Sequence, residues 1–282
     1  MLRTFFTYIR LMEPREWFKN IVIFAPLFFA KEFFDTQKFT TTFFTFLVFC
    51  ITTSTVYILG DYYAIEHNKR HRKKNNHPFI TEEVSSVKGL FFAGIIFLIA
   101  LTIALWITPI LWLLVIAYLI FNFIYIRFLK HIPTIEIVTL VGFYVLCLIA
   151  GGLVTNTPIS DWLIIWIIFL SLFLVLGKRR YSFRTESKEY SPILAYYNEL
   201  FLEHALSVSG TLTIVTYSIF IILTAPEHAV YSILFVIVGM LRYFQAIHTT
   251  RHSRPFEYIL VSDPLMLGTL FLWIVYLFVI FY

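Results

Sequence analysis

Charged residues are scarce in this sequence. Only 14% of its 282 residues are Asp, Glu, Lys or Arg, whereas 59% are hydrophobic, and the mean hydropathy is +0.80. So few polar side chains cannot cover the surface of a water-soluble globule of this length. The composition therefore predicts an integral membrane protein.

Cysteines and linker segments are also lacking. The two cysteines, Cys50 and Cys147, both fall inside apolar runs, which excludes a disulfide framework and a Cys metal site and favours packing as small hydrophobic residues. No Gly/Ser-rich or Pro-rich segment divides the chain, so we expect a single polytopic domain over residues 1–282. No stretch alternates with a period of two over about ten residues, which argues against a β-barrel.

Long apolar runs make up most of what is present. A helix needs roughly 20 apolar residues to cross the hydrocarbon core, where its backbone must satisfy its own hydrogen bonds. The predicted fold class is therefore an all-α membrane bundle of about nine transmembrane helices. The first run is the least regular, because Lys19 and Asn20 lie near its start and Pro26 interrupts it, so we expect a kink there. The nine runs are 17–34, 39–59, 89–107, 109–126, 133–155, 161–177, 205–224, 229–248 and 264–282.

Lys and Arg are distributed unevenly between the loops. With nine crossings, 20 of the 22 basic residues fall on one face, including six in the 60–88 loop and five in the 178–204 loop. Basic residues are retained on the cytoplasmic side during insertion. This asymmetry predicts a cytoplasmic N-terminus, two polar cytoplasmic loops and an exoplasmic C-terminus, and we expect the protein in the bacterial inner (plasma) membrane.

The first polar loop opens with an acidic residue and continues into dense positive charge. If the preceding helix continues, Asp61, Ala64 and Asn68 share a face, while Glu66 points away. Mg²⁺ is commonly bound through one or two carboxylates together with substrate phosphate oxygens, so Asp61 is a minimal ligand. The basic run at 69–74 suits phosphate, but a topology signal at anionic lipid headgroups explains it as well.

The second polar loop opens with three consecutive cations, Lys178, Arg179 and Arg180, followed by Tyr181. At the membrane surface these side chains could bind the phosphate of an amphiphile whose tail stays in lipid. A helix C-terminus also favours cations through its dipole, by about 0.3–1 kcal/mol each. Both interpretations remain open from the residues alone.

Several short sequence elements are spread in order along nearly the whole chain. They are Trp17-Phe-Lys-Asn20 with Phe24-Ala-Pro26, the Asp61 loop closing with His77-Pro78-Phe79-Ile80, Tyr125-Ile-Arg-Phe-Leu-Lys130 with Pro133 and Glu136, Ala150-Gly151, Gly177-Lys-Arg179, and Arg254-Pro-Phe-Glu257 with Ser262-Asp-Pro264. Together with the nine-helix frame, they resemble the decaprenyl-phosphate phosphoribosyltransferase branch of the UbiA-type prenyltransferases.

The resemblance implies a helical bundle around a cavity that opens to the cytoplasm. There, a polyprenyl phosphate would attack C1 of phosphoribosyl pyrophosphate, or a similar pyrophosphate donor, in cell envelope biosynthesis. The implied cofactor is Mg²⁺, and the partners are the lipid, the donor and the membrane. A homo-oligomer is compatible with this function, and no nucleic acid is expected.

The resemblance also implies roles for individual residues. Asp61, Glu66 and Lys178 would be catalytic, and Asp61, Glu66 and Asn68 would be the metal-binding residues. The implied substrate-binding residues are Lys19, Asn20, Lys69, Arg70, Lys74, Tyr125, Lys130, Glu136, Lys178, Arg179, Arg180 and Tyr181.

The sequence departs from the family pattern inside this predicted site. The pattern has further acidic residues where this chain has Ala64 and Asn68, and an arginine where it has Cys147. Each difference removes charge, which leaves two alternatives open. One is a non-catalytic polyprenyl-phosphate-binding membrane subunit. The other is a UbiA-type aromatic prenyltransferase, against which the Gly177-Lys-Arg179 element argues, because such enzymes more often carry another Asp-rich motif there.

Overall fold

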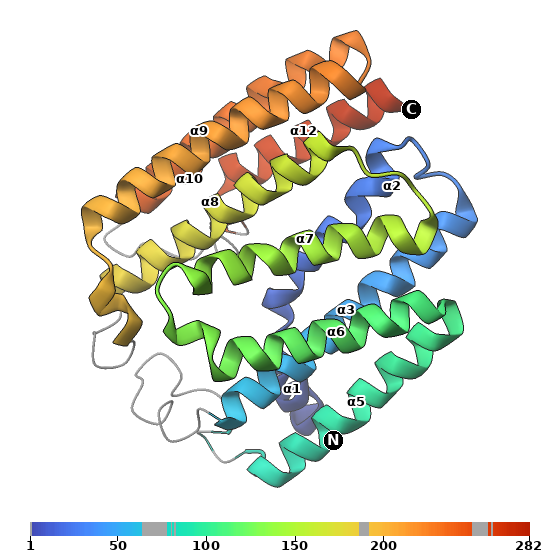
Figure 1. The fold of residues 1–282 in the computed structure, drawn as a ribbon, viewed down its shortest axis with the longest axis vertical. Helices are drawn as coiled ribbons and strands as arrows, with labels where there is room; N and C mark the ends of the chain where they lie inside the picture. Colours follow the sequence, from blue (N-terminus) through green and yellow to red (C-terminus); the bar gives the residue numbers. More distant parts are fainter. Residues whose placement is uncertain are drawn as a thin grey trace. The chain divides into compact units, whose positions relative to one another are not determined.

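The computed structural model describes residues 2–63, 78–79, 81, 83–185, 192–249, 259–260 and 262–282. The regular structure in these residues is helical (Figure 1). Its elements are α1 (Leu2–Leu11), η1 (Pro14–Phe24), α2 (Ala25–Phe29), α3 (Thr36–Tyr63), α5 (Ser86–Ile107), α6 (Pro109–Arg127), η3 (Leu129–His131), α7 (Ile135–Thr155), α8 (Asp161–Thr185), η4 (Pro192–Tyr196), α9 (Glu199–Thr224), η5 (Glu227–Ser232), α10 (Ile233–Thr249) and α12 (Pro264–Phe281).

Within the described residues, eight helices are long and apolar enough to cross a membrane. They are α3, α5, α6 with η3, α7, α8, α9, η5 with α10, and α12. These helices coincide with the last eight of the nine predicted stretches. The predicted all-α class is confirmed, and the chain is a multi-pass integral membrane protein.

The first predicted stretch differs from the others. It is a 3₁₀ segment, η1, followed by the short helix α2, rather than one continuous α-helix. Pro14 starts η1 and Pro26 lies in the first turn of α2, where the 3₁₀ segment changes to α-helix. The helix α1 before it was not predicted, because ten residues that include Arg3 and Arg10 give no membrane-spanning signal.

Helix α8 also extends further than predicted. Its apolar stretch was expected to end at residue 177, with a polar loop from residue 178, but the helix continues to Thr185. A helix bonds its own backbone groups and therefore has no need to end where its apolar residues end. The cations Lys178, Arg179, Arg180 and Arg184 consequently have fixed directions on a helix.

The chain divides into two compact units. The first comprises residues 1–28, 32–130 and 146–158, and the second comprises residues 29–31, 131–145 and 159–282. In the first unit, α3 packs against η1, α5 and α6. In the second unit, α8 packs against α9, and α10 packs against α12.

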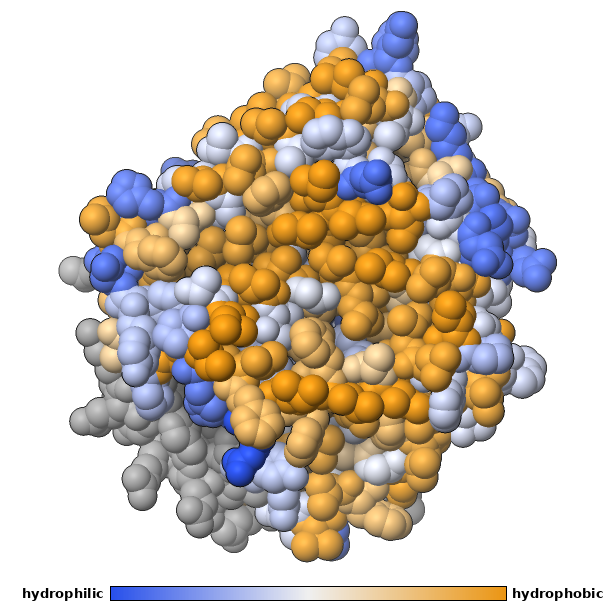
Figure 2. Space-filling model, in the orientation of Figure 1, coloured by the Kyte–Doolittle hydropathy of each residue, from blue (hydrophilic) through white to orange (hydrophobic). Residues whose placement is uncertain are grey.

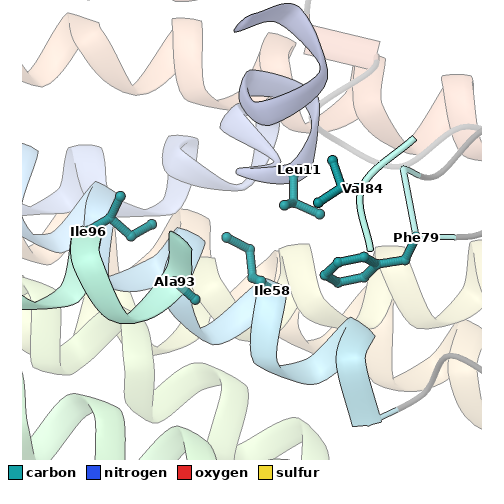
Figure 3. Packing of buried hydrophobic residues seen from close by; sticks show 6 residues of the cluster. All are labelled: Leu11, Ile58, Phe79, Val84, Ala93 and Ile96. Carbon is teal, nitrogen blue, oxygen red and sulfur yellow. The ribbon is translucent and has the colours of Figure 1, made fainter. Parts of the chain in front are cut away.

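An apolar cluster in the first unit fixes the end of the 60–88 loop (Figure 3). It is formed by Leu11, Ile58, Phe79, Val84, Ala93 and Ile96, which come from α1, α3, α5 and the segment before α5. The Phe79 ring lies so close to Gly89 that a Cβ there would come within 2.3 Å of Phe79 Cε1. Thr7 and Arg10 of α1 also donate hydrogen bonds to Glu83. The Pro78-Phe79 element therefore anchors the chain where it returns to the membrane.

The lipid-facing character of the surface is evident from its exposed side chains. Trp106 is 87% exposed and Phe91 is 71% exposed, although both lie on the membrane-spanning helix α5. Hydrophobic residues cover most of the face shown in Figure 2. Such exposure would be costly in water and is the expected arrangement in a bilayer.

Gly151 provides a test of the packing in the first unit. A Cβ at this position would lie 2.1 Å from the backbone oxygen of Ile23, so α7 and η1 could not keep their distance. We expect Gly151→Ala to reduce stability by about 1–3 kcal/mol, measured by thermal unfolding in detergent. Gly94→Ala is the matched control, because nothing lies within 4 Å of a Cβ there. Equal melting temperatures for the two variants would contradict this packing.

The stability that the start of α12 contributes to the fold should depend on pH. Asp263 accepts hydrogen bonds from the amides of Leu265 and Met266 and pairs with Arg242 of α10, at 2.7 Å between Nη2 and Oδ2. The Arg242 guanidinium lowers the pKa of the Asp263 carboxyl. The ionised pair therefore stabilises the fold above the unfolded pKa of Asp, and this contribution is lost as the pH falls through the lower folded pKa.

Asp263→Asn tests this dependence, because Asn also caps helices but carries no charge. We expect the wild type to melt at a higher temperature than Asp263→Asn at neutral pH. The difference should shrink below about pH 4. A difference that is the same at both pH values would show that the charge of Asp263 contributes nothing.

Candidate functional site

One face of α3 carries several polar groups of the first unit. Thr53, Tyr57 and Asp61 follow one another at intervals of four residues, so they lie one above another along the helix. Thr53 and Asp61 are buried, and Tyr57 is half-buried. A polar stripe inside a membrane-spanning helix usually faces a protein interior or a cavity rather than lipid.

Lys19 lies against this stripe. Its Nζ is 3.3 Å from Tyr57 Oη and 4.8 Å from the centre of the Tyr57 ring. Tyr57 donates to Glu16 Oε2 at 2.6 Å, and Lys19 Nζ is 3.8 Å from the same carboxylate. The predicted substrate-binding residue Lys19 is therefore held by a hydrogen bond, a cation–π contact and an ion pair.

Asn20, the neighbour of Lys19, is fully buried. Its amide nitrogen lies 3.2 Å from Thr53 Oγ1 and 3.6 Å from Cys50 Sγ, and its amide oxygen lies 3.6 Å from Cys147 Sγ. Both cysteines are free and buried, as predicted. Tyr118 of α6 extends the cluster through a 3.2 Å contact with Thr53. The cluster is uncharged at its centre.

Asp61 is 4% exposed and lies near the end of α3. The other residues predicted to act beside it, Glu66, Asn68, Lys69, Arg70 and Lys74, lie outside the described residues. Across the part of the chain that is described, no group of three or more His, Cys, Asp or Glu side chains is arranged to hold a metal ion.

An apolar groove of about 210 Å³ lies in the first unit between α3 and α6, and it is open on one side, since Tyr63, Ile120 and Phe123 in its lining are 64%, 53% and 49% exposed. Its lining is almost entirely hydrocarbon and aromatic, and it includes Tyr63, two residues after Asp61. The other lining residues are Val56, Leu59, Leu119, Ile120, Phe123 and Ile126. A groove of this character suits a hydrocarbon chain.

A charged site of the second unit forms around Glu136, which is only 1% exposed. One of its carboxylate oxygens pairs with Arg179 Nη2 of α8, and the other accepts a hydrogen bond from Tyr197 Oη at 3.1 Å. Burial raises the pKa of Tyr197. Its hydroxyl therefore stays protonated and is the hydrogen-bond donor to Glu136. Two predicted substrate-binding residues, Glu136 and Arg179, are thus bonded directly to each other.

Arg180 faces the protein interior. Its side chain is 1% exposed, and it donates to Glu203 of α9 at 2.8 Å and to the Ile247 carbonyl of α10 at 3.1 Å. Arg180 is predicted to bind substrate phosphate, whereas its observed partners, Glu203 and the Ile247 carbonyl, belong to two other helices of the second unit. Gly177 has a packing role here, because a Cβ would lie 2.1 Å from Tyr243 Oη.

The remaining predicted residues that the structure describes lie on α6, η3 and α8. Tyr125 is on α6, Lys130 is in η3, and Lys178 and Tyr181 are on α8, all half-buried. The residues that the sequence analysis missed are Glu16, Tyr57 and Tyr197. Tyr57 could have been found, because it lies one turn before Asp61. Tyr197 carried no such signal, since its contact with Glu136 joins residues 61 positions apart.

Residues 21–275 match the UbiA prenyltransferase family. Decaprenyl-phosphate phosphoribosyltransferase of Mycolicibacterium smegmatis is 26% identical over 220 residues, covering 75% of this chain and 69% of that protein. The protein of the same name from Mycobacterium tuberculosis H37Rv is 27% identical over 218 residues, covering 75% and 72%.

The fold is similar to that of a UbiA homolog from Archaeoglobus fulgidus, whose structure was solved with GPP and Mg²⁺ bound. The two structures superpose with a TM-score of 0.71 over 98% of this chain and 99% of that one, at 14% sequence identity. At this identity the likeness shows a common fold.

Arg180 and Arg184 allow a buried and an exposed ion pair on one helix to be compared. We expect Arg180→Met to lower the free energy of unfolding by about 1–3 kcal/mol, because the Ile247 carbonyl and one carboxylate oxygen of Glu203 lose a charged donor. Arg184→Met should cost less than about 1 kcal/mol, because its pair with Glu199 is exposed to solvent. Thermal unfolding in detergent measures both. Unchanged stability of Arg180→Met together with lost phosphate binding would instead support the substrate role.

Proposed function

The chain belongs to the UbiA prenyltransferase family, and we propose that it transfers a 5-phosphoribosyl or related pyrophosphate-activated group to a polyprenyl phosphate, with release of pyrophosphate. The predicted family is confirmed, and the specific transfer is the proposal. One observation carries it. Arg179 is held by the buried carboxylate of Glu136 at the polar end of α8, in a chain similar to decaprenyl-phosphate phosphoribosyltransferases over three quarters of its length.

The proposed reaction makes limited demands on the protein. An oxygen of the lipid phosphate attacks C1 of the ribosyl group, and the bond from C1 to the pyrophosphate oxygen breaks, so that pyrophosphate leaves with the electron pair. The lipid phosphate is already anionic near neutral pH and needs no strong base. The larger demand is to stabilise the departing pyrophosphate and the positive charge that develops on the sugar.

The two units offer groups that suit these demands. In the first unit we assign Lys19 to substrate phosphate and the apolar groove between α3 and α6 to part of the isoprenoid chain. In the second unit we assign Lys178 and Arg179 to the pyrophosphate. The uneven distribution of basic residues supports a site on the cytoplasmic side of a bacterial inner membrane.

Asp61 fits a magnesium ion that is shared with the substrate. It supplies one buried carboxylate, and Mg²⁺ commonly combines one or two carboxylates with substrate phosphates and water. When bound, Mg²⁺ would neutralise charge on the pyrophosphate. The UbiA homolog solved with GPP and Mg²⁺ supports a divalent ion in proteins of this fold. We propose that Glu66 and Asn68 assist Asp61.

A second candidate is a membrane subunit that binds polyprenyl phosphate without transferring anything to it. The observation that favours it is the presence of Ala64 and Asn68 at positions where the family pattern has acidic residues. This candidate retains the cations and the apolar groove, and it does not need the metal ion.

A transfer assay tests the proposed function. The detergent-purified protein is incubated with radiolabelled phosphoribosyl pyrophosphate, Mg²⁺ and a polyprenyl phosphate, and label is measured in the organic phase. We expect transfer by the wild type, and a loss of about a hundredfold or more in Asp61→Asn, which keeps the size of the side chain but removes its charge. Asp161→Asn is the control, because Asp161 is an exposed residue at the opposite end of α8 from Arg179.

Two outcomes would contradict these assignments. If the wild type does not transfer label under conditions in which one of the related phosphoribosyltransferases does, the proposed activity is wrong. Binding of polyprenyl phosphate that depends on Lys178 and Arg179 but not on Mg²⁺ would then support the binding subunit. If Asp61→Asn is as active as the wild type, Asp61 does not hold the ion.

A further inference from the structure

Tyr197 has no role in the sequence pattern, yet it joins two elements of the second unit. It lies between η4 and α9 and is 5% exposed. Its hydroxyl oxygen accepts the backbone N–H of Thr134 at 2.9 Å, and the hydroxyl donates to Glu136 Oε1 at 3.1 Å. Both partners lie at the start of α7. One hydroxyl group thus ties the chain before α9 to the beginning of α7.

The Thr134 contact determines the direction of the Tyr197 hydroxyl. Because the oxygen accepts the N–H of Thr134, its own hydrogen is directed to Glu136. Thr134 has a φ of 67°, in the left-handed region that a β-branched residue rarely adopts. This unfavourable backbone conformation points the Thr134 N–H at Tyr197, and the contacts around Thr134 must therefore maintain it.

Glu136 transmits this constraint to Arg179. Its two oxygens have different partners, Tyr197 on Oε1 and Arg179 on Oε2, so the carboxylate is restrained from rotating about its last bond. The Arg179 side chain remains 15% exposed, and the contact with Glu136 is made through Nη2. A guanidinium has N–H donors on two further nitrogens, which suit a phosphate.

We propose that Tyr197 is a positioning residue for the pyrophosphate group of the donor substrate. It holds Glu136 in the orientation that presents Arg179 to the pyrophosphate. This inference rests on the proposed function in one respect, namely that Arg179 binds pyrophosphate. Tyr197 itself touches neither the substrate nor the reacting atoms.

Tyr197→Phe tests the inference, because it removes only the hydroxyl. The readout is the affinity of the full-length, detergent-purified protein for inorganic pyrophosphate, measured by calorimetry. We expect binding to weaken about five- to tenfold, since a charge-assisted hydrogen bond is lost one step from the ligand. In the transfer assay, KM for the donor should rise by a similar factor while kcat changes little. Tyr196→Phe is the matched control, because the neighbouring Tyr196 is 73% exposed and should bind and react like the wild type.

A double variant separates positioning from a merely structural role. If Tyr197 acts through Arg179, Tyr197→Phe should not weaken pyrophosphate binding further in an Arg179→Gln background. Equal weakening in both backgrounds would overturn the inference, as would wild-type affinity in Tyr197→Phe. Thermal unfolding of each variant shows whether a loss of affinity reflects a loss of folded protein.

The calorimetric measurement also keeps this inference distinct from the proposed function. A wild type that binds pyrophosphate but transfers no label would contradict the proposed function, and the variants would still decide the role of Tyr197. A wild type that does not bind pyrophosphate would overturn the inference, because Arg179 would then not be a pyrophosphate-binding residue.

Discussion

The hydrocarbon core of a bilayer offers no hydrogen-bond partner, and the rest of this structure follows from that constraint. The backbone satisfies it by forming helices, and the side chains satisfy it in the same local way. Thr52 and Thr213 each donate a hydroxyl hydrogen to the carbonyl four residues earlier, at 2.8 Å. Side chains that cannot be satisfied within their own helix, such as Asn20 and Glu136, need partners from other helices. Each such residue therefore specifies how helices pack.

This division explains which parts could be predicted from sequence. Apolar length is a property of each segment alone, so all eight long helices were found, although α8 ends later and α9 starts earlier than predicted. Helix ends that depend on features other than apolar length were not predicted correctly. Helix α8 continues to Thr185 because its polar last turns bond to α7 and α9, and η1 is not an α-helix although its residues are largely apolar. Hydropathy measures the preference for lipid and contains no information about neighbouring helices.

The candidate site was predictable to a similar extent. Residue types and local spacing, together with the family resemblance, identified Asp61, Lys19, Glu136 and Arg179 as residues with a chemical role to explain. They did not reveal that Glu136 and Arg179 are bonded to each other, because that contact joins residues 43 positions apart. Tyr197 was missed for the same reason. Pairing between distant segments follows from tertiary packing, which a single sequence does not display.

The pairing also changes the meaning of the basic cluster at 178–184. In the sequence it is a concentration of positive charge, but in the structure Arg179, Arg180 and Arg184 each bond to a glutamate, namely Glu136, Glu203 and Glu199. Three of the four cations of this cluster are thus offset by a nearby opposite charge, so its attraction for a phosphate rests less on accumulated charge than the sequence alone indicates. Donors held in a fixed geometry then matter more, and a buried carboxylate beside a partly exposed guanidinium provides one. Under this constraint the orientation of Glu136 matters as much as the presence of Arg179.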